Sequence, residues 1–208
     1  MSSDLTYKVD HIPEDSNKRT GLFMDVEYIT IHSTGNPNST AAVERNWLTN
    51  PDNNNSTAFH IVVDEDEAIE VFPLDEVAWH AGDGTNGDGN TKSIGIEIIE
   101  SGDREKCLEK AIEVTIKTLR EHNLRYDALR THNDWSGKNC PRILIDSDHR
   151  ESETHTWDWF VTRVKNLMNR VVYIYANKES YNELFSEEIS DSKKEKNLIL
   201  IMHPMITY

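Results

Sequence analysis

Hydrophobic and polar residues follow one another along the chain in patterns that predict both strands and helices. Residues 26–32 (VEYITIH) alternate apolar and polar types, which is typical of a strand with one buried face. Residues 59–72 (FHIVVDEDEAIEVF) hold two β-rich runs around an acidic turn and predict a hairpin. Residues 93–100 (SIGIEIIE) are almost continuously apolar, as in a central strand buried on both faces. A short strand is expected around residues 128–131.

Helical spacing of apolar residues appears between and after these strands. Ser39 or Thr40 can cap a first helix. Apolar residues three and four positions apart predict an amphipathic helix over residues 104–122, and the same spacing predicts a last helix that includes Phe160. This order of elements predicts one α/β domain, in which helices flank a central, mainly mixed β-sheet.

The polarity of the chain divides it into three parts. Residues 1–22 are polar and predict an irregular leader, residues 23–172 contain the predicted elements, and residues 173–208 predict a polar tail that is flexible or the remnant of a lost module. Within the domain, residues 79–90 (WHAGDGTNGDGN) predict a long loop rich in Gly and Asn. A compact domain keeps such a loop mainly for function, unless the loop is disordered.

Charge and composition exclude several classes of function. The 208 residues carry a formal net charge of −15, whereas nucleic-acid binding depends on clustered Lys and Arg. Nucleic acid is therefore not expected as a partner. The amino-terminal residues lack the apolar run of a signal peptide, and no segment approaches the roughly 20 apolar residues of a membrane-spanning helix. We expect neither a signal peptide nor a transmembrane segment.

Three side chains suggest a metal site. His32 and His132 each stand at the end of a predicted strand, where α/β proteins place binding and catalytic groups. Cys140 follows His132 in a polar loop. Two imidazoles and a thiolate suit tetrahedral zinc with the fourth position left for water. Histidines so far apart in sequence also occur in cores and on surfaces, so the three residues alone leave both interpretations open.

Four motifs resemble a known family. In chain order they are ITIHSTG, AFHIVVDEDEAIEVFPLDEVAWHAGDG, SIGIEI and THNDWSGKNCPR. They are similar to motifs of the type 2 N-acetylmuramoyl-L-alanine amidases, which include phage endolysins and share a fold with the peptidoglycan recognition proteins. The resemblance covers about residues 26–170 and implies an α/β domain with a zinc site at the strand ends.

The resemblance also implies a role for each residue that matches the family's motifs. His32, His132 and Cys140 are expected to bind Zn²⁺. Glu97, an acid within a strand of isoleucines, is expected to be the general base that takes a proton from the metal-bound water. Lys138 is expected to stabilise the oxyanion that forms when water adds to the amide carbonyl.

Other residues near these motifs lead to further expectations. His80 is expected to border the substrate, and Trp79 is expected either to border it as well or to lie in the core. Phe59 stands where some phage members carry a tyrosine with a catalytic hydroxyl, so Glu97 must take more of the proton transfer. Glu100, at the strand end, is expected to be solvated, and Cys107 to be a small buried hydrophobe.

The resemblance implies a zinc amidase that hydrolyses the bond between the lactyl group of N-acetylmuramic acid and the L-alanine of the stem peptide. A monomeric phage or prophage endolysin or bacterial autolysin is expected, made in the cytoplasm and acting on peptidoglycan of the cell wall after release. Two alternatives are a peptidoglycan-recognition module without turnover and a different zinc hydrolase on an unrelated α/β fold. Glu97, Lys138 and Cys140 argue against the first, and the order of the motifs argues against the second.

Overall fold

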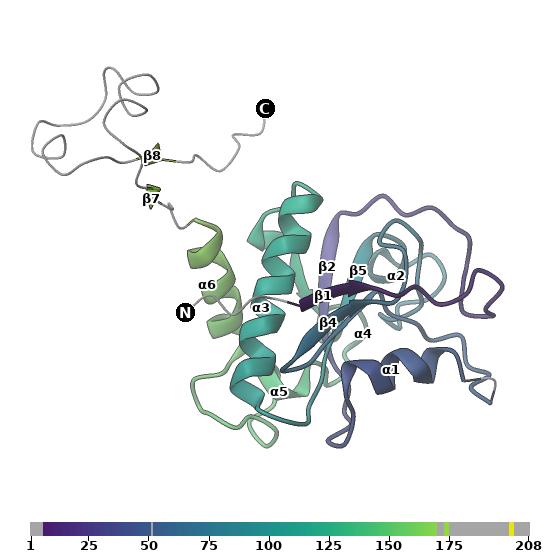
Figure 1. Ribbon diagram of the computed structural model, residues 1–208, viewed down its shortest axis with the longest axis horizontal. Helices are drawn as coiled ribbons and strands as arrows, with labels where there is room; N and C mark the ends of the chain where they lie inside the picture. The colour runs from purple at the N-terminus through teal and green to yellow at the C-terminus, as the bar shows by residue number, and fades with distance from the viewer. Residues whose placement is uncertain (1–5, 51, 170–172, 175–199, 202–208) are drawn as a thin grey trace, which may run out of the picture. The chain divides into compact units, whose positions relative to one another are not determined.

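A six-stranded mixed sheet forms the centre of the computed structural model, which describes residues 6–50, 52–169, 173–174 and 200–201 (Figure 1). The strand order is β1-β4-β3-β5-β2-β6. Only β3 and β4 pair antiparallel among neighbouring strands of this sheet, and the other pairs are parallel. The strands span Thr6–Val9 (β1), Tyr28–Ser33 (β2), Ile61–Val63 (β3), Glu67–Glu70 (β4), Ser93–Ile98 (β5) and Leu129–Thr131 (β6). The sheet confirms the predicted mixed α/β domain.

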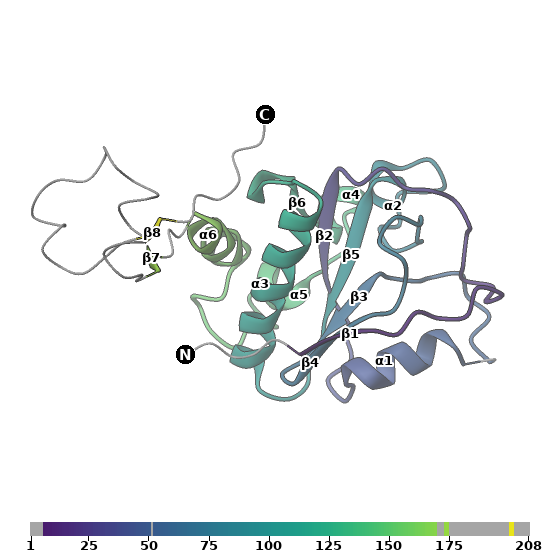
Figure 2. The same ribbon diagram turned by 45° about the horizontal axis from the view of Figure 1, so that its top comes forward.

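Helices cover both faces of this sheet. Figure 2 shows α3 and, outside it, α6 on one side of the sheet, with α1 on the other side. The helices span Ala41–Leu48 (α1), Asp88–Thr91 (α2), Arg104–Glu121 (α3), His132–Ser136 (α4), Arg142–Ile145 (α5) and Trp157–Met168 (α6), and a 3₁₀ turn (η1) spans Tyr126–Ala128. The amphipathic helix expected over residues 104–122 is therefore confirmed as α3.

The central strands β2 and β5 separate an apolar face from a polar one. Ile29 and Ile31 of β2 are fully buried on one face, beside the isoleucines of β5. Thr30 and His32 point to the opposite face, because successive strand residues alternate. This polar face is buried as well, so the expectation of one buried face for this strand was wrong. The covering groups include the indole of Trp135 in α4, whose Nε1 donates to Thr30 Oγ1 at 2.8 Å.

The predicted hairpin and the first helix form a second part of the core. The β3–β4 hairpin is confirmed, and Asp64 Oδ1 accepts the backbone N–H groups of Asp66 and Glu67 in its turn, both at 2.9 Å. Thr40 caps α1 by accepting from Val43 N at 3.2 Å. Apolar residues of α1, β3, β4 and the segments around them make one cluster that includes Leu48, Ala58, Phe59, Val62, Ile69 and Phe72.

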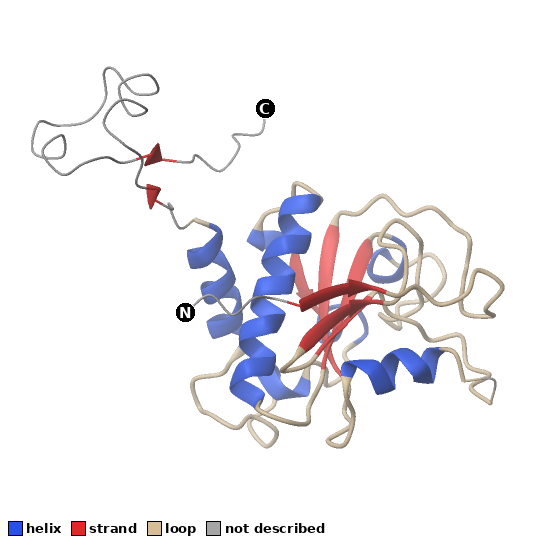
Figure 3. Cartoon of the chain, in the orientation of Figure 1, coloured by secondary structure: helices blue, strands red, loops and turns tan. Residues whose placement is uncertain are grey.

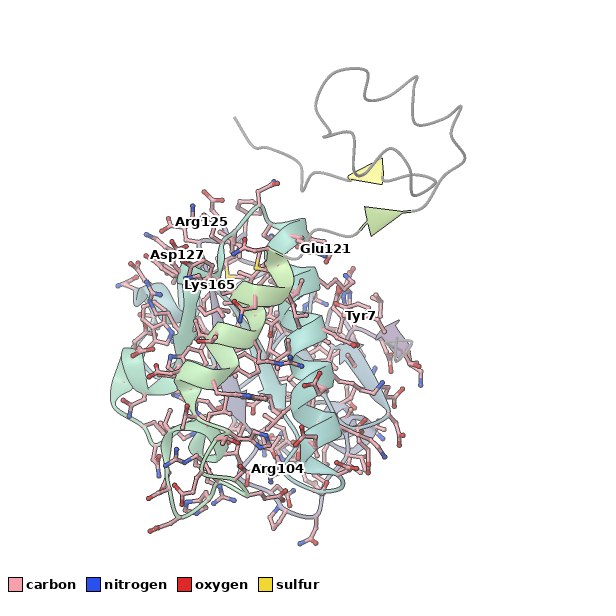
Figure 4. The ribbon with its side chains drawn as sticks, turned by 90° about the vertical axis from the view of Figure 1, so that its left-hand side faces the viewer. Tyr7, Arg104, Glu121, Arg125, Asp127 and Lys165 are labelled. Carbon is pink, nitrogen blue, oxygen red and sulfur yellow. The ribbon has the colours of Figure 1, made fainter. Side chains whose placement is uncertain are left out.

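The last helix of the domain packs on α3. Its Phe160 and Val164 are fully buried, and Arg163 Nη2 donates to Glu109 of α3 at 2.7 Å. Figure 4 shows Lys165 of α6 near Arg125 and Asp127, and the Lys165 ammonium lies 4.9 Å from the ring centroid of Tyr126. Apolar burial and surface charge pairs thus both hold α6.

Two segments differ from the expected irregular structure. Thr6–Val9 is a strand, although residues 1–22 were expected to be an irregular leader. It pairs in parallel with β4, and Tyr7 Oη donates to Glu70 Oε2 at 2.6 Å. A segment of four residues with one strongly apolar side chain is too short to show the alternation that predicts a strand. Residues 10–27, which follow, are mostly loop (Figure 3). The second segment, expected as a loop from His132 onward, begins with the short helix α4.

The carboxyl-terminal part forms a separate unit from residue 166 onward. Within it, β7 (Tyr173–Ile174) pairs antiparallel with β8 (Leu200–Ile201). The remainder of the predicted tail, residues 173–208, lies outside the described residues. Among the helices that the structure describes, none combines the length and the hydropathy that crossing a bilayer requires.

We predict that a chain ending at Arg170 folds like the full chain. It retains every strand of the six-stranded sheet together with Phe160 and Val164, the fully buried side chains of α6. Thermal unfolding followed by circular dichroism should give melting temperatures within about 3 °C of each other, the shift that roughly 1 kcal/mol causes in a domain of this size. An insoluble or non-cooperative product would show that residues 171–208 belong to the fold.

Candidate active site

The structure brings His32, His132 and Cys140 together at the ends of neighbouring strands. His32 lies near the end of β2, and His132 directly follows β6, the parallel neighbour of β2. The Nδ1 atoms of the two histidines are 3.0 Å apart, and Cys140 Sγ is 3.7 Å from His32 Nδ1. One ligand atom from each residue lies within 4.8 Å of the others, and all three residues are buried. These side chains can hold a metal ion.

Local hydrogen bonds place the second histidine and the cysteine. Thr131 caps α4 in a reciprocal pair with Asp134, so the chain turns at His132. The Asn133 N–H then donates to the Cys140 carbonyl at 3.0 Å, which folds the loop back. The Ser33 N–H points at Cys140 Sγ at 3.4 Å. The thiol is thereby held against the end of β2.

Burial keeps the imidazoles of this cluster neutral and the thiol protonated. Burial lowers the pKa of His32 well below its usual range, and His80 and His132 lower it further. Burial and the charge of Lys138 lower the pKa of His132 to about 4. Burial, followed by the charge of Glu97, raises the pKa of the Cys140 thiol to about 12. Neutral imidazoles are the form that binds metal, and a bound cation displaces the thiol proton.

Glu97 lies beside the three residues on the same face of the sheet. It pairs with His32 in the β5–β2 register, and its Oε1 is 4.0 Å from His32 Nδ1. Burial raises the pKa of Glu97 to about 8 against the opposing charge of Lys138. Within the described residues, its buried Oε2 has no hydrogen-bond partner. Such a carboxyl group can accept a proton close to the cluster.

Lys138 and the long loop border a cleft of about 600 Å³ next to the cluster. Lys138 lies close enough for its charge to lower the pKa of both His132 and Glu97. Trp79 and His80 also line the cleft, as do Ser56, Thr57, Gly82, Gly84, Thr85, Asn90, His132 and Ser136. The cleft therefore opens beside Lys138 and the His132 end of the cluster, while Glu97, His32 and Cys140 are not among its lining residues.

Phe59 and Cys107, both named from the sequence, lie in the core together with His60. Phe59 is buried in the apolar cluster. Cys107 is fully buried, with its Sγ 3.6 Å from the Ser101 carbonyl, which confirms the expected buried hydrophobe. His60 accepts the Gly95 N–H at Nδ1 at 2.9 Å, and its Nε2 donates to the Glu76 carbonyl. Both nitrogens of His60 are thus used within the sheet.

Glu100 was expected to be solvated, and that expectation was wrong. Its side chain is only 4% exposed. Its Oε2 accepts hydrogen bonds from Arg142 Nε at 2.9 Å and from Arg142 Nη2 at 2.6 Å. The Gly35 N–H donates to its Oε1 at 2.9 Å. Burial acts to raise the pKa of Glu100, but the bonds from Arg142 and its neighbours outweigh it and lower the pKa. Glu100 therefore joins the segment after His32 to the segment after Cys140.

Comparisons with known proteins agree on one family. The sequence pattern of a family described as N-acetylmuramoyl-L-alanine amidase matches residues 22–143. The N-acetylmuramoyl-L-alanine amidase CwlH of Bacillus subtilis (strain 168) is 42% identical over 146 residues, which cover 68% of this chain and 58% of CwlH. CwlA of the same strain is 46% identical over 126 residues, or 59% of this chain and 45% of CwlA. This chain spans about half the length of these curated relatives.

Solved structures give the same result for the fold. The catalytic domain of XlyA is 38% identical, with a TM-score of 0.69 over 77% of this chain and 99% of that domain. The structure of PlyL is 34% identical, with a TM-score of 0.65 over 78% of this chain and 97% of that one. The match covers almost the whole of both neighbours.

We predict that Glu100→Gln destabilises the fold, because it keeps the shape of the side chain but removes the charge that Arg142 binds. Urea unfolding at pH 7 should show a loss of about 2 kcal/mol in the free energy of unfolding. Since folding lowers the pKa of Glu100, this stabilisation is complete above the ordinary carboxyl pKa of about 4.3 and is lost as the pH falls through the lower folded value.

The matched control is Glu121→Gln, which removes a charge pair with Lys117 on the exposed face of α3. An exposed pair of this kind contributes less than about 0.5 kcal/mol. Equal losses in the two variants, or a Glu100→Gln effect that grows in acid, would contradict the buried pairing.

Proposed function

Because the chain belongs to the N-acetylmuramoyl-L-alanine amidase family, we propose that it hydrolyses the amide bond between the lactyl group of N-acetylmuramic acid and L-alanine in peptidoglycan. The observation that carries this proposal is the buried His32, His132 and Cys140 cluster with Glu97 beside it, next to a cleft that His132 and Lys138 line. A module that only binds peptidoglycan has no need of a carboxyl group with a buried oxygen that lacks a hydrogen-bond partner among the described residues, next to three metal-type ligands. The substrate class comes from the family.

We propose Zn²⁺ as the metal, held by His32, His132 and Cys140. Nδ1 of His132 and Nδ1 of His32 face each other at 3.0 Å. A cation between the two imidazoles can bind a lone pair of each ring at once, and the soft thiolate favours zinc. When bound, zinc supplies a Lewis acid at the cleft.

Glu97 and Lys138 are proposed to act on the transition state. Glu97 takes the proton of the attacking water and passes it to the leaving nitrogen. A bound cation favours the carboxylate form of Glu97, which burial alone disfavours. Lys138 provides a positive charge for the oxygen that becomes negative as water adds to the carbonyl. Phe59, in the core, has no hydroxyl with which to share this work.

The cleft is the proposed place for the stem peptide and its sugar. Trp79, at the start of the long loop, lines it, and among the lining residues Lys138 carries the charge. The chain is then an endolysin or autolysin that acts on the cell wall. CwlH and XlyA are themselves named amidases, which supports turnover over recognition alone.

We predict that Cys140→Ser weakens zinc binding strongly, because a hydroxyl is a poor ligand in place of a soft thiolate. Zinc content after dialysis against a mild chelator measures the effect. Cys107→Ser is the matched control, since it makes the same exchange at a buried cysteine far from the cluster in sequence and without a ligand role. Stoichiometric zinc in Cys140→Ser, or equal loss in both variants, would refute the ligand assignment.

We predict that Glu97→Gln and Lys138→Ala keep zinc and the fold but lose turnover. Because both groups act on the transition state, kcat should fall by about 10²- to 10³-fold with a smaller change in KM. Release of new L-alanine amino termini from a soluble muropeptide measures the rate. Lys106→Ala, which removes an exposed lysine at the start of α3, is the control. A wild-type kcat in Glu97→Gln would remove Glu97 from the mechanism.

A further inference from the structure

We propose that His80 is a positioning residue that fixes the orientation and the tautomer of His32, so that His32 presents an unprotonated Nδ1 to His132 and Cys140. The proposal rests on the metal site of the proposed function. In this proposal the ring of His80 contacts the metal ligand His32, whereas the sequence led us to expect a contact with the substrate. It also gives the long loop of residues 79–90 a defined task.

A chain of hydrogen bonds connects the backbone of β5 to His32. His80 Nε2 lies 3.0 Å from the Ser93 carbonyl, and His80 Nδ1 lies 3.0 Å from His32 Nε2. The carbonyl oxygen can only accept, so Nε2 of His80 carries the proton. In neutral His80, Nδ1 is then an acceptor, and His32 Nε2 must donate to it. The remaining nitrogen of neutral His32, Nδ1, keeps its lone pair.

This lone pair points to the other two candidate ligands. His32 Nδ1 is the atom that lies 3.0 Å from His132 Nδ1 and 3.7 Å from Cys140 Sγ. Without the acceptor on His80, His32 is free to carry its proton on either nitrogen. A proton on Nδ1 blocks metal binding, so loss of the acceptor reduces the fraction of the protein that is ready to bind.

His80 is itself held rigidly. The ring packs against Gly95 of β5, where an added Cβ would come within 2.9 Å of the ring atoms Cγ and Nδ1. Asn90 Oδ1 accepts the backbone N–H groups of both His80 and Ala81 at 2.8 Å, and Asn90 Nδ2 donates to the Gly84 carbonyl. The glycine opens the space for the ring, and the asparagine fixes the backbone that carries it.

The same loop reaches the second histidine. An added Cβ at Gly82, two residues after His80, would come within 3.3 Å of His132 Nε2. The loop therefore lies against both imidazoles of the cluster, against His32 through the ring of His80 and against His132 at Gly82. Hydrogen-bond partners such as His80 raise metal affinity because they fix the ligand before the ion arrives.

Three variants test the assignment. His80→Ala removes the acceptor. His80→Asn returns an amide oxygen near the position of Nδ1 and should rescue part of the function. Gly95→Ala leaves all polar groups in place but displaces the ring of His80. The control is His122→Asn, the same exchange at a partly buried histidine that follows α3 and belongs neither to the cluster nor to the residues that line the cleft.

The zinc dissociation constant, measured by competition with a chromophoric chelator, is the main readout. We expect His80→Ala and Gly95→Ala to weaken zinc binding by about 10- to 100-fold, His80→Asn to weaken it less, and His122→Asn to leave it unchanged even where the melting temperature falls. Co²⁺ absorption spectra of the same proteins should change for His80→Ala and Gly95→Ala. Nitrogen-15 NMR of the metal-free wild type should show the His32 proton on Nε2.

The outcomes separate this inference from the proposed function. A wild type that takes up neither Zn²⁺ nor Co²⁺ refutes the metal site and, with it, the role of His80. A wild type that binds zinc, together with a folded His80→Ala that binds equally well and shows the same Co²⁺ spectrum, refutes the positioning role alone. If His80→Ala does not fold, Gly95→Ala decides the question: a loss of zinc affinity that His122→Asn does not show supports the role, and binding as tight as in the wild type refutes it.

Discussion

The parallel register of β5, β2 and β6 is the constraint on which the site depends. It sets Glu97 opposite His32 and Ile31 opposite Thr131, so that His132 follows at the same edge of the sheet. A slip of one residue in either pair would turn one of these side chains to the isoleucine face. Because those isoleucines are fully buried, such a slip would place carboxyl or imidazole groups in the core. Burial of the apolar face thus determines the geometry of the polar one.

The polar face then has to be satisfied without water. Thr30 and Ser93 share a hydrogen bond at 2.6 Å, and the indole of Trp135 donates to the same threonine. At its rim, the Glu100 pair with Arg142 ties the segments that follow two of the ligands. Each of these bonds gives a partner to a buried polar group. Left without one, such a group would lower the free energy of unfolding by about 1 to 3 kcal/mol. Beside the cluster, Glu97 Oε2 is a buried atom that has no hydrogen-bond partner within the described residues.

Sequence patterns predicted the parts of the fold in which local signals and packing agree. The long stripe of α3, the β3–β4 hairpin and the apolar β5 strand were all predicted. The strand β1 was missed because only its pairing with β4 makes it a strand. Glu100 was misjudged because its partner Arg142 is distant in sequence. The motifs identified the residues of the site. The hydrogen bonds that orient these residues depend on how a glycine-rich loop packs on the sheet, and no local sequence pattern predicts that packing.

Burial alone does not distinguish a ligand histidine from a structural one. His32, His60 and His80 are all buried, and burial lowers the pKa of each. They differ in what their ring nitrogens face. Each nitrogen of His60 and His80 meets a hydrogen-bond partner within the fold, whereas Nδ1 of His32 faces another imidazole nitrogen and a thiol. Two imidazole nitrogens and a thiol can form only weak hydrogen bonds among themselves, whereas a shared cation, bound with loss of the thiol proton, can be coordinated by all three. The lone pair on His32 Nδ1, traced from a backbone carbonyl through His80, is therefore the structural mark of the ligand.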